Sequence, residues 1–527
     1  MSSPRPSSPH ATLAAVASLV DGELAGADRV VTGVTLSSQD VVEGDLYAAL
    51  PGANTHGARY AAGARDAGAV AVLTDAEGAA ALAAEGLDLP RVVVEDPRSH
   101  VGQVASLVYG TVDLPLQMYG VTGTNGKTTT AYLVNSALIA LGHTTGLIGT
   151  VETRIGDERI KSVRTTPEAT VLHALLAVMT ERGIDSCVME VSSHALSQHR
   201  VDGVVYDIAL FTNLSQDHLD FHPTMRDYFL AKADLFTPQR SRTGIVCVDD
   251  EWGRELAATI STVPVTTVTS LADVDADWRL VAGEEDPATF TLSDGSTALH
   301  LRSALPGDFN RVNTAMAALA LLAAGIPADD AERALLVDPH VPGRMERVVV
   351  EPAEGPATGP GSADLPLVVV DYAHTPDAVA AALKALRPAT SGRLVVVLGA
   401  GGDRDRGKRA AMGRAAAEGA DLVVVTDDNP RSEVPGAIRA AVLDGARAAG
   451  TAAELRDVEG RASAIAQAVR AAHEAGPGSV VAVVGKGHET GQEIAGTVHP
   501  FDDRDEARRA LDSLLDQTPH DPDGGAR

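Results

Sequence analysis

Cysteine, aromatic residues and lysine are all scarce in this sequence of 527 residues. The first two scarcities exclude or disfavour particular kinds of fold. The two cysteines, Cys187 and Cys247, allow at most one disulfide bridge and do not lie at metal-ligand spacing, so a disulfide scaffold is excluded. Aromatic residues make up only 3%, whereas glycine, alanine and valine are abundant, which favours an α/β architecture over an aromatic-rich β fold. No run of 18 or more apolar residues occurs, so we expect no membrane insertion.

Positive charge is also in short supply. The chain has 71 acidic and 43 basic residues, which gives a formal net charge of −28. Nucleic-acid binding and binding to an anionic membrane both need a basic surface, so this charge argues against both. The first ten residues, MSSPRPSSPH, lack the apolar core of a signal peptide and predict a disordered lead. We therefore expect a cytoplasmic protein that acts on small molecules, and we expect a monomer.

Short apolar strands alternate with alanine-rich helical stretches along most of the chain. Strands are predicted at Ser186–Val191, Ile208–Asn213 and Thr243–Val248, and a second series begins near residue 366 with LPLVVVDYA, RLVVVLGA, DLVVVTDD and SVVAVVGKG. Continuous apolar strands followed by helices are typical of parallel sheets that are buried on both faces. The pattern predicts an α/β fold with domains at 1–115, 116–343 and 344–517, a Pro/Gly-rich loop at 351–364 and a disordered tail at 518–527.

A glycine-rich loop follows one predicted strand and opens a predicted helix, with the sequence Gly123-Thr124-Asn125-Gly126-Lys127-Thr128. In such a loop backbone N–H groups surround phosphate oxygens, and the helix N-terminus adds a favourable field. Lys127, one of only six lysines, can reach the β- and γ-phosphates, and the Thr128 hydroxyl suits magnesium. The general P-loop pattern has glycine where this chain has Val121. The order of strand, loop and helix nevertheless favours nucleotide binding over a structural glycine turn.

Polar residues follow several other predicted strands. Glu190 leaves a buried strand beside the glycine-rich loop and can hold magnesium as a Walker-B acid does. His218 lies in the polar segment NLSQDHLD, and Lys232 follows in YFLAK. In the second half, GGDRDRGKR places a basic loop after a strand, where open α/β sheets bind ligands. Its glycines do not fit a dinucleotide fingerprint, because Arg404 stands where the third glycine would be.

These segments together resemble the Mur ligase family. The resemblance rests on TGTNGKTT, EVSSH, NLSQDHLDFH, DYAHTPDA, GGDRDRGKR, TDDNPR and GKGHE, in this order along nearly the whole chain. It implies a UDP-binding N-terminal domain, a central P-loop ATPase domain with a parallel sheet and a C-terminal Rossmann-like domain. It also implies the ATP-dependent addition of meso-2,6-diaminopimelate to the D-glutamate of UDP-N-acetylmuramoyl-L-alanyl-D-glutamate through an acyl phosphate, in peptidoglycan precursor synthesis.

The resemblance also assigns roles to residues. It implies two Mg²⁺ ions, one held by Thr128 and Glu190 and the other by His218 and Lys232, with Lys232 as a carbamate (N6-carboxylysine) derived from carbon dioxide. The implied catalytic residues are Lys127, Glu190, His218 and Lys232. The implied ATP contacts are Gly123, Thr124, Asn125, Gly126, Lys127, Thr128, Thr129, Asn310 and Arg344. The implied UDP-muramyl-peptide contacts are Leu36, Ser38, Ala53, Asn54, Thr55, Thr165, Thr166, Ser192, Gln198 and Arg200. The implied amino-acid contacts are Arg404, Asp428, Asn429, Pro430, Arg431, Gly485 and Glu489.

Selectivity for diaminopimelate over lysine is predicted from Asp428-Asn429-Pro430-Arg431. Diaminopimelate has a second carboxylate, which a guanidinium can hold with two parallel hydrogen bonds. Lysine would leave Arg431 desolvated and unpaired, which predicts discrimination of roughly 10⁴ or more. The alternatives are a lysine-adding Mur ligase, a folylpolyglutamate synthetase and, in another class, a P-loop ATPase switch. A switch would hydrolyse ATP without an amino acid, whereas a ligase needs all its substrates.

Overall fold

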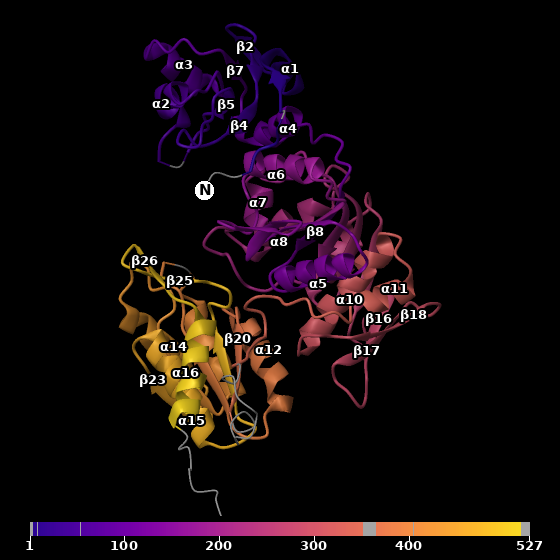
Figure 1. Ribbon diagram of the computed structural model, residues 1–527, viewed down its shortest axis with the longest axis vertical. Coiled ribbons are helices and arrows are strands. Elements are labelled where there is room, and N and C mark those ends of the chain that lie inside the picture. Colours follow the sequence, from indigo (N-terminus) through magenta and orange to yellow (C-terminus); the bar gives the residue numbers. More distant parts are fainter. Residues whose placement is uncertain (1–3, 8, 53, 351–364, 404, 518–527) are drawn as a thin grey trace, which may run out of the picture.

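The computed structural model describes residues 4–7, 9–52, 54–350, 365–403 and 405–517, and it has the α/β fold that the sequence predicts (Figure 1). Three large sheets, each with helices packed against it, follow one another along the chain. The first lies at the top of Figure 1, the second in the middle and the third at the lower left. Ala53, Arg404, the 351–364 stretch and the 518–527 tail lie outside the described residues. No helix in the described part is long and apolar enough to cross a membrane.

The N-terminal sheet has the strand order β2-β7-β6-β5-β4 and is parallel except for its edge strand β2. Helix α4 (Pro97–Tyr109) follows it. The Asp96 side chain caps the first turn of this helix, and Gly110 ends it in the left-handed conformation that glycine favours. The strands are β2 (Glu23–Ala25), β4 (Gly33–Thr35), β5 (Asp45–Ala48), β6 (Ala71–Thr74) and β7 (Arg91–Val93).

Helix α4 also joins the N-terminal region to the central one. It packs against α6 (Ala169–Glu181), and a single apolar core contains Val101 and Val104 of α4 together with Ala174 and Ala177 of α6. Small alanine side chains allow the two helices to approach closely. The N-terminal and central regions therefore share a continuous apolar interior.

The described part of the N-terminal lead makes specific contacts, which contradicts the prediction of a disordered lead. Arg5 donates to both carboxylate oxygens of Asp45, at 2.5 and 2.9 Å. Ser7 donates from its backbone N and its hydroxyl to Glu181 at the end of α6. Because Asp45 is buried, its pairing with Arg5 avoids an isolated charge in the interior. The lead thus connects the N-terminal sheet to the central region.

The central sheet has eleven strands in the order β11-β10-β9-β12-β8-β13-β14-β15-β16-β17-β18. The strands from β9 to β16 are parallel, as predicted, but both ends of the sheet are antiparallel. The antiparallel ends are hairpins, and their turns, Gly156-Asp157 and Asp294-Gly295, contain glycines with positive φ. The strands are β8 (Gln117–Thr122), β9 (Thr145–Ile148), β10 (Glu152–Ile155), β11 (Glu158–Lys161), β12 (Ser186–Glu190), β13 (Tyr206–Phe211), β14 (Ser241–Cys247), β15 (Val265–Thr269), β16 (Trp278–Ala282), β17 (Thr289–Ser293) and β18 (Ala298–Arg302).

Helices cover both faces of the central sheet. Residues that alternate along β8 face opposite sides, as the period of a strand requires: Tyr119 and Val121 join the core under α5 (Lys127–Ala140) and α10 (Asp308–Ala323). Met118 joins the other core, with α6, α7 (Ser193–Ser197) and α8 (Met225–Ala233). The loops at the carboxyl ends of β8, β12 and β13 are therefore held between two packed layers.

The C-terminal sheet has the order β19-β20-β24-β21-β22-β23 and is parallel except for the edge strand β19. Helices α12 (Pro376–Leu386), α13 (Lys408–Gly419) and α14 (Pro435–Ala448) pack on one face, and α15 (Arg461–Glu474) and α16 (Asp503–Gln517) pack on the other. A hairpin of β25 (Gly491–Ile494) and β26 (Thr497–Pro500) stands apart from the sheet. The remaining strands are β19 (Glu346–Val348), β20 (Leu367–Asp371), β21 (Leu394–Leu398), β22 (Leu422–Val425), β23 (Glu454–Asp457) and β24 (Val480–Val484).

Polar contacts connect the central and C-terminal regions. Asp217, after β13, lies 3.6 Å from His374, after β20, and 3.7 Å from Lys408, after β21. Arg344 donates to the Thr128 hydroxyl at 3.2 Å. Asp217, His374 and Lys408 follow the carboxyl ends of strands, and Thr128 lies at the end of the glycine-rich loop. That end of a parallel sheet is where open α/β folds bind ligands. The two sheets thus present their binding edges to each other.

Candidate active site

The glycine-rich loop connects β8 to α5 in a conformation that requires its glycines. Gly123 and Gly126 have φ values of 144° and 88°. A Cβ atom at Gly123 would lie 1.9 Å from the hydroxyl oxygen of Thr212, so any other residue would displace the loop. Lys127 begins α5, and its Nζ donates to the carbonyl oxygens of Gly123 at 2.9 Å and Thr124 at 3.0 Å. The lysine therefore points back over the loop, where phosphate oxygens bind in a P-loop.

The segment just after β13 supports this loop from the side. Asn213 accepts from the backbone N of Thr124 through its carbonyl oxygen, at 2.9 Å, and from the backbone N of Asn125 through Oδ1, at 3.0 Å. Burial lowers the pKa of Lys127, while Glu190 and Asp217 act in the opposite direction. A loop held by a neighbouring strand is preorganised for an anion, so less conformational freedom is lost when one binds.

Glu190 lies beside the loop and is buried. Its Oε2 accepts from the hydroxyl groups of Thr128 and Thr150, both at 2.9 Å, and its Oε1 accepts from the Thr150 backbone N at 2.8 Å. The Thr128 hydroxyl also accepts from Arg344. Sequence analysis did not identify Thr150, because its contact with Glu190 spans 40 positions and no local pattern marks it.

The pair Thr128 and Glu190 fits a magnesium ion. Two oxygens on adjacent corners of an octahedron with bonds of about 2.1 Å lie about 3 Å apart, and these two oxygens are 2.9 Å apart. Within the described residues, no group of three or more histidine, cysteine, aspartate and glutamate side chains could hold a metal. In nucleotide sites magnesium is commonly held by one or two protein oxygens together with phosphate oxygens and water, and Thr128 and Glu190 would supply two such oxygens.

Lys232 lies at the end of α8 and is buried. Its Nζ donates to the Gly123 carbonyl at 2.8 Å, the same oxygen that accepts from Lys127. It also lies 4.6 Å from the centre of the Tyr228 ring. Burial, with a further contribution from Lys127, lowers the pKa of Lys232 well below its usual value. A neutral amine is the form that attacks carbon dioxide, so the surroundings of Lys232 fit the predicted carbamate.

His218 also lies near Tyr228, and the centres of the two rings are 6.0 Å apart. Burial lowers the pKa of His218, which keeps the imidazole neutral and able to bind a metal. Its ring contacts His194 edge-on at 4.9 Å. The predicted partners Lys232 and His218 are thus both neighbours of Tyr228.

Asn310 begins α10 and is connected to the loop through Asn313. Asn313 donates to Asn310 Oδ1 at 3.1 Å and accepts from the Thr130 hydroxyl at 3.3 Å. A Cβ at Gly126 would lie 2.5 Å from Asn313 Oδ1, so the two touch. Sequence analysis missed Asn313, although its spacing of three from Asn310 places both on one helix face.

Five predicted muramyl-peptide contacts gather where β12 ends, beside Glu190. The Thr166 hydroxyl donates to the Glu190 carbonyl at 2.9 Å and accepts from the Ser192 backbone N at 3.0 Å. Arg200 donates to Gln198 at 2.5 Å and to the Thr166 carbonyl at 3.4 Å. The fifth, Thr165, has its hydroxyl 3.0 Å from that of Thr150.

The predicted uridine contacts lie in the N-terminal region, away from the loop. Leu36 and Ser38 follow β4, and Asn54 and Thr55 follow β5, so all four lie beyond carboxyl ends of neighbouring parallel strands. Ala53 lies outside the described residues. The structure therefore places these four at a binding edge of their own sheet, and it shows no contact between them and the loop among the described residues.

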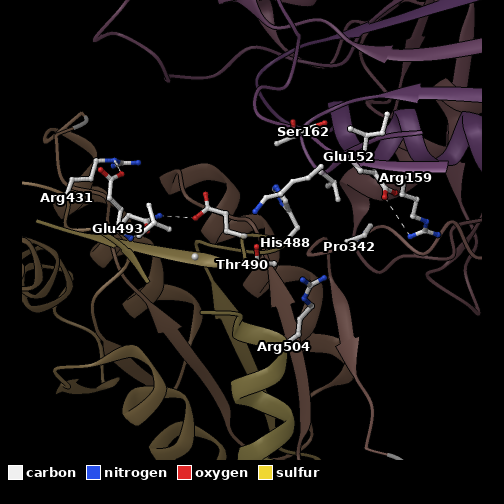
Figure 2. A pocket seen from close by; sticks show the side chains of 17 residues that line it. Glu152, Arg159, Ser162, Pro342, Arg431, His488, Thr490, Glu493 and Arg504 are labelled. Atoms are coloured by element: carbon white, nitrogen blue, oxygen red, sulfur yellow. Dashed lines mark hydrogen bonds and ion pairs between the residues drawn. The ribbon is translucent and has the colours of Figure 1, made fainter. Parts of the chain in front are cut away.

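The predicted amino-acid contacts lie at a cleft of about 650 Å³ between the central and C-terminal regions (Figure 2). Asn429, Arg431 and Glu489 line it from the C-terminal side, whereas Arg404 lies outside the described residues. Glu152 and Arg159 of the β10–β11 hairpin line it from the central side, and Figure 2 shows both on the opposite side of the view from Arg431. The cleft carries both signs of charge, which suits an amino acid with ammonium and carboxylate groups.

Arg431 has a left-handed backbone, with φ of 51°. Its Nη1 donates to the Gly402 carbonyl at 2.6 Å, and its Nε lies 3.4 Å from Glu493. Asp428 and Gly485 touch each other below the cleft, since a Cβ at Gly485 would lie 2.6 Å from Asp428 Oδ2. Pro430 is buried between Asn429 and Arg431. The predicted set is thus brought together, apart from Arg404, and Arg431 is not a freely exposed surface arginine.

Three family models match the chain: "Mur ligase family, catalytic domain" at residues 30–109, "Mur ligase middle domain" at 121–322 and "Mur ligase, glutamate ligase domain" at 360–487. The UDP-N-acetylmuramoyl-L-alanyl-D-glutamate–2,6-diaminopimelate ligase of Streptomyces avermitilis is 51% identical over 514 residues, covering 96% of this chain and 98% of the relative. The protein of the same name from Streptomyces coelicolor is 53% identical over 486 residues, with 91% and 92% covered. A UDP-N-acetylmuramyl-tripeptide synthetase of Leifsonia xyli is 47% identical over 511 residues, with 95% and 96% covered.

Solved structures agree with these relatives. A structure of a UDP-N-acetylmuramoyl-L-alanyl-D-glutamate–2,6-diaminopimelate ligase is 31% identical and has a TM-score of 0.62, covering 92% of this chain and 95% of that one. The MurF ligase of Thermotoga maritima in complex with ADP is 16% identical, with a TM-score of 0.58 and coverage of 92% and 98%, and shares the fold. The matched models, the identities and the shared fold lead to one conclusion: the chain belongs to the Mur ligase family of ATP-dependent ligases.

Proposed function

We propose that the chain joins an amino group of meso-2,6-diaminopimelate to the side-chain carboxylate of the D-glutamate in UDP-N-acetylmuramoyl-L-alanyl-D-glutamate. The main support is that the P-loop, with Lys127 and Thr128, and the charged cleft, with Arg431 and Glu489, come from two regions whose binding edges meet. Relatives about half identical to this chain are named for this reaction.

The first proposed step activates the glutamate carboxylate. A carboxylate is a poor acylating agent, so the γ-phosphoryl group of ATP moves to it and gives an acyl phosphate and ADP. Lys127 stabilises the negative charge that spreads over the phosphoryl oxygens. Thr128 and Glu190 would hold the magnesium ion, which neutralises phosphate charge when bound. Arg344, which already reaches Thr128, adds a positive group at the same place.

The second proposed step forms the amide bond. The neutral amine of diaminopimelate attacks the carbonyl carbon of the acyl phosphate, the C–O bond to phosphate breaks, and inorganic phosphate leaves. Bringing the amine and the acyl phosphate together supplies much of the rate, because the effective molarity of two well-oriented groups contributes roughly 7–11 kcal/mol. The cleft between the central and C-terminal regions is where the two meet.

Lys232 and His218 complete the proposed site. As a carbamate, Lys232 offers anionic oxygens in place of an ammonium, and with the neutral His218 it would hold the second magnesium ion. The support is the buried, low-pKa amine and its place beside Tyr228. Asn310 and Arg344 would contact the nucleotide, together with the loop.

The three regions take separate parts of the substrates in this proposal. Residues 1–115 would hold the UDP end through the edge around Leu36, Ser38, Asn54 and Thr55. Residues 116–343 would hold ATP and the peptide end, and residues 344–517 the amino acid. ATP and UDP-linked precursors are made inside the cell, so the proposed reaction is cytoplasmic, and the proposed active unit is the monomer.

One assay tests the proposal. Phosphate release from ATP is measured with the UDP-muramyl dipeptide and, in turn, diaminopimelate, lysine or no amino acid. We expect release only when all three substrates are present, and with diaminopimelate rather than lysine. Release without an amino acid would indicate the ATPase switch instead, and release with lysine would indicate the lysine-adding branch of the family.

A further inference from the structure

Two cations are fully buried beneath the amino-acid cleft and have no role in the proposal so far. Lys486 follows β24 and Arg461 begins α15, and the side chains of both are 0% exposed. Burying a charge costs free energy unless the charged group is paired and hydrogen-bonded, so the partners of each cation indicate what it does. Arg461 is held by two bonds to Asp503, at 2.6 and 2.7 Å. Lys486, by contrast, is held by residues of the cleft itself.

The partners of Lys486 are two of the predicted amino-acid contacts. Its Nζ donates to Asn429 Oδ1 at 3.1 Å and to Glu489 Oε2 at 2.9 Å. Asn429 closes the network, because its Nδ2 donates to the same Glu489 oxygen at 2.9 Å. An ammonium group can only donate, so Lys486 fixes which end of the Asn429 amide faces it. The backbone N of Glu493 also donates to Asn429 Oδ1, at 2.9 Å, which agrees with this orientation.

The network uses only one of the two carboxylate oxygens of Glu489. Oε2 accepts from Lys486 and from Asn429, whereas no residue in the described part of the chain donates to Oε1. The Glu489 side chain is 32% exposed and lines the cleft. Among the described residues, Oε2 is therefore anchored by two donors, whereas Oε1 has none and is open to a ligand in the cleft. Lys486 has no exposed surface in this arrangement and acts only through its partners.

We propose that Lys486 is a positioning residue that orients Glu489 to accept a hydrogen bond from the distal ammonium of the incoming amino acid. The inference rests on the proposed function, because it needs the cleft to be the amino-acid site. The positive charge of Lys486 repels the distal ammonium of the substrate, so Lys486 does not contribute by attraction. It contributes by holding the Glu489 carboxylate in place, so that the second carboxylate oxygen faces the cleft. Lys486 thereby sets the preference for a diamino acid over an amino acid with one amino group.

The test compares diaminopimelate with 2-aminopimelate, which keeps both carboxylates and the reacting amino group but lacks the distal one. The ratio of the two kcat/KM values measures recognition of the distal ammonium and does not depend on the fraction of enzyme that is folded. In Lys486→Met, kcat/KM for diaminopimelate should fall about 10- to 100-fold, as for other residues that orient a binding group. The value for 2-aminopimelate should change little, so the ratio should approach one.

Two further variants complete the test. Glu489→Gln should lose the same preference, and the double variant Lys486→Met/Glu489→Gln should show no additional loss, because the two act as one unit. Lys384→Met is the matched control, since Lys384 is 79% exposed and pairs with Asp308, and neither residue lines the cleft. Its ratio should equal that of the wild type.

The outcomes separate this inference from the proposed function. Wild-type enzyme that does not ligate diaminopimelate contradicts the proposed function itself. Wild-type enzyme that ligates diaminopimelate and 2-aminopimelate equally well, or a Lys486→Met variant with an unchanged ratio, overturns the role of Lys486 alone. If Lys486→Met retains too little folded protein, Lys486→Gln is measured in the same way, with ADP binding as the indicator of folding.

Discussion

Arg431 offers the sharpest test of amino-acid selectivity, because its backbone is held independently of its side chain. The Arg431 N–H donates to the Glu493 carbonyl at 3.0 Å, and the Ala495 N–H donates to the Arg431 carbonyl at 2.7 Å. The left-handed backbone costs about 1 kcal/mol or somewhat more for any residue except glycine, so Arg431→Ala keeps this cost unchanged. We therefore expect the free energy of unfolding to change by less than about 1 kcal/mol.

The structure lowers the expected size of the selectivity. The prediction of roughly 10⁴ assumed that lysine would leave Arg431 unpaired. Arg431 is instead 24% exposed and already has the Gly402 carbonyl and Glu493 as partners without any substrate. A hydrogen bond to a charged group contributes about 1.5–3 kcal/mol, and a substrate carboxylate must replace part of what is present. A net gain of about 3 kcal/mol corresponds to roughly 10²-fold in kcat/KM.

The assay measures kcat/KM for diaminopimelate and for lysine, together with KM for ATP and for the UDP-muramyl dipeptide. In Arg431→Ala, kcat/KM for diaminopimelate should fall about 10²-fold, while both other KM values stay within about twofold. Arg447→Ala is the control, because Arg447 is 63% exposed and pairs only with Asp444 on its own helix among the described residues. Wild-type enzyme that uses lysine as well as diaminopimelate would refute the reasoning, and so would an equal loss for both amino acids in Arg431→Ala.

Three other predictions follow from the site and the core. Lys127→Ala should reduce ATP-dependent ligation by about 10³-fold or more, because the phosphoryl oxygens lose their fixed counter-charge, and near-normal turnover would reject the P-loop role. Lys232→Ala should be nearly inactive and regain some activity with added short carboxylates. Intact-mass measurement showing unmodified Lys232 in fully active enzyme would contradict the carbamate. Burial lowers the pKa of His173 to about 4, so between pH 6.5 and 4 the unfolded state binds a proton that the folded state does not. The free energy of unfolding should therefore fall as the pH falls through this window, by up to about 3 kcal/mol, and urea titrations at several pH values should show a smaller fall in His173→Gln.

The local parts of the structure could be predicted from the sequence. The loop from Gly123 to Thr128 lies between a strand and a helix as expected, because glycine spacing and apolar runs are properties of neighbouring residues. The strand that ends in Glu190 was predicted within one residue of its bounds, Ser186–Glu190. The resemblance to a family supplied the rest of the site, and most of those residues lie together in the structure.

Contacts between distant segments could not be predicted. Asp217 meets His374 and Lys408 across two regions, and Lys486 meets Asn429 over 57 positions, which no local pattern records. Composition was misleading at the N-terminus. Proline and serine there favour disorder, but Arg5 pairs with the buried Asp45, and a charge pair of this kind outweighs weak local preferences.

The N-terminal and C-terminal regions contact the central region in different ways, and this affects how easily each can move against it. Alanines of α6 complete the apolar core of the N-terminal region, so turning that region against the central one would expose buried apolar surface to water. The C-terminal region meets the central one through polar contacts at Asp217, Thr128 and Asp308, which water can replace at little cost. One apolar side chain of the central region, Phe309, also packs against the C-terminal core. We therefore expect the C-terminal region to turn against the central one more readily than the N-terminal region does. Such a turn would carry the proposed amino-acid cleft toward or away from the P-loop, while the proposed UDP-binding edge would keep its distance from the loop.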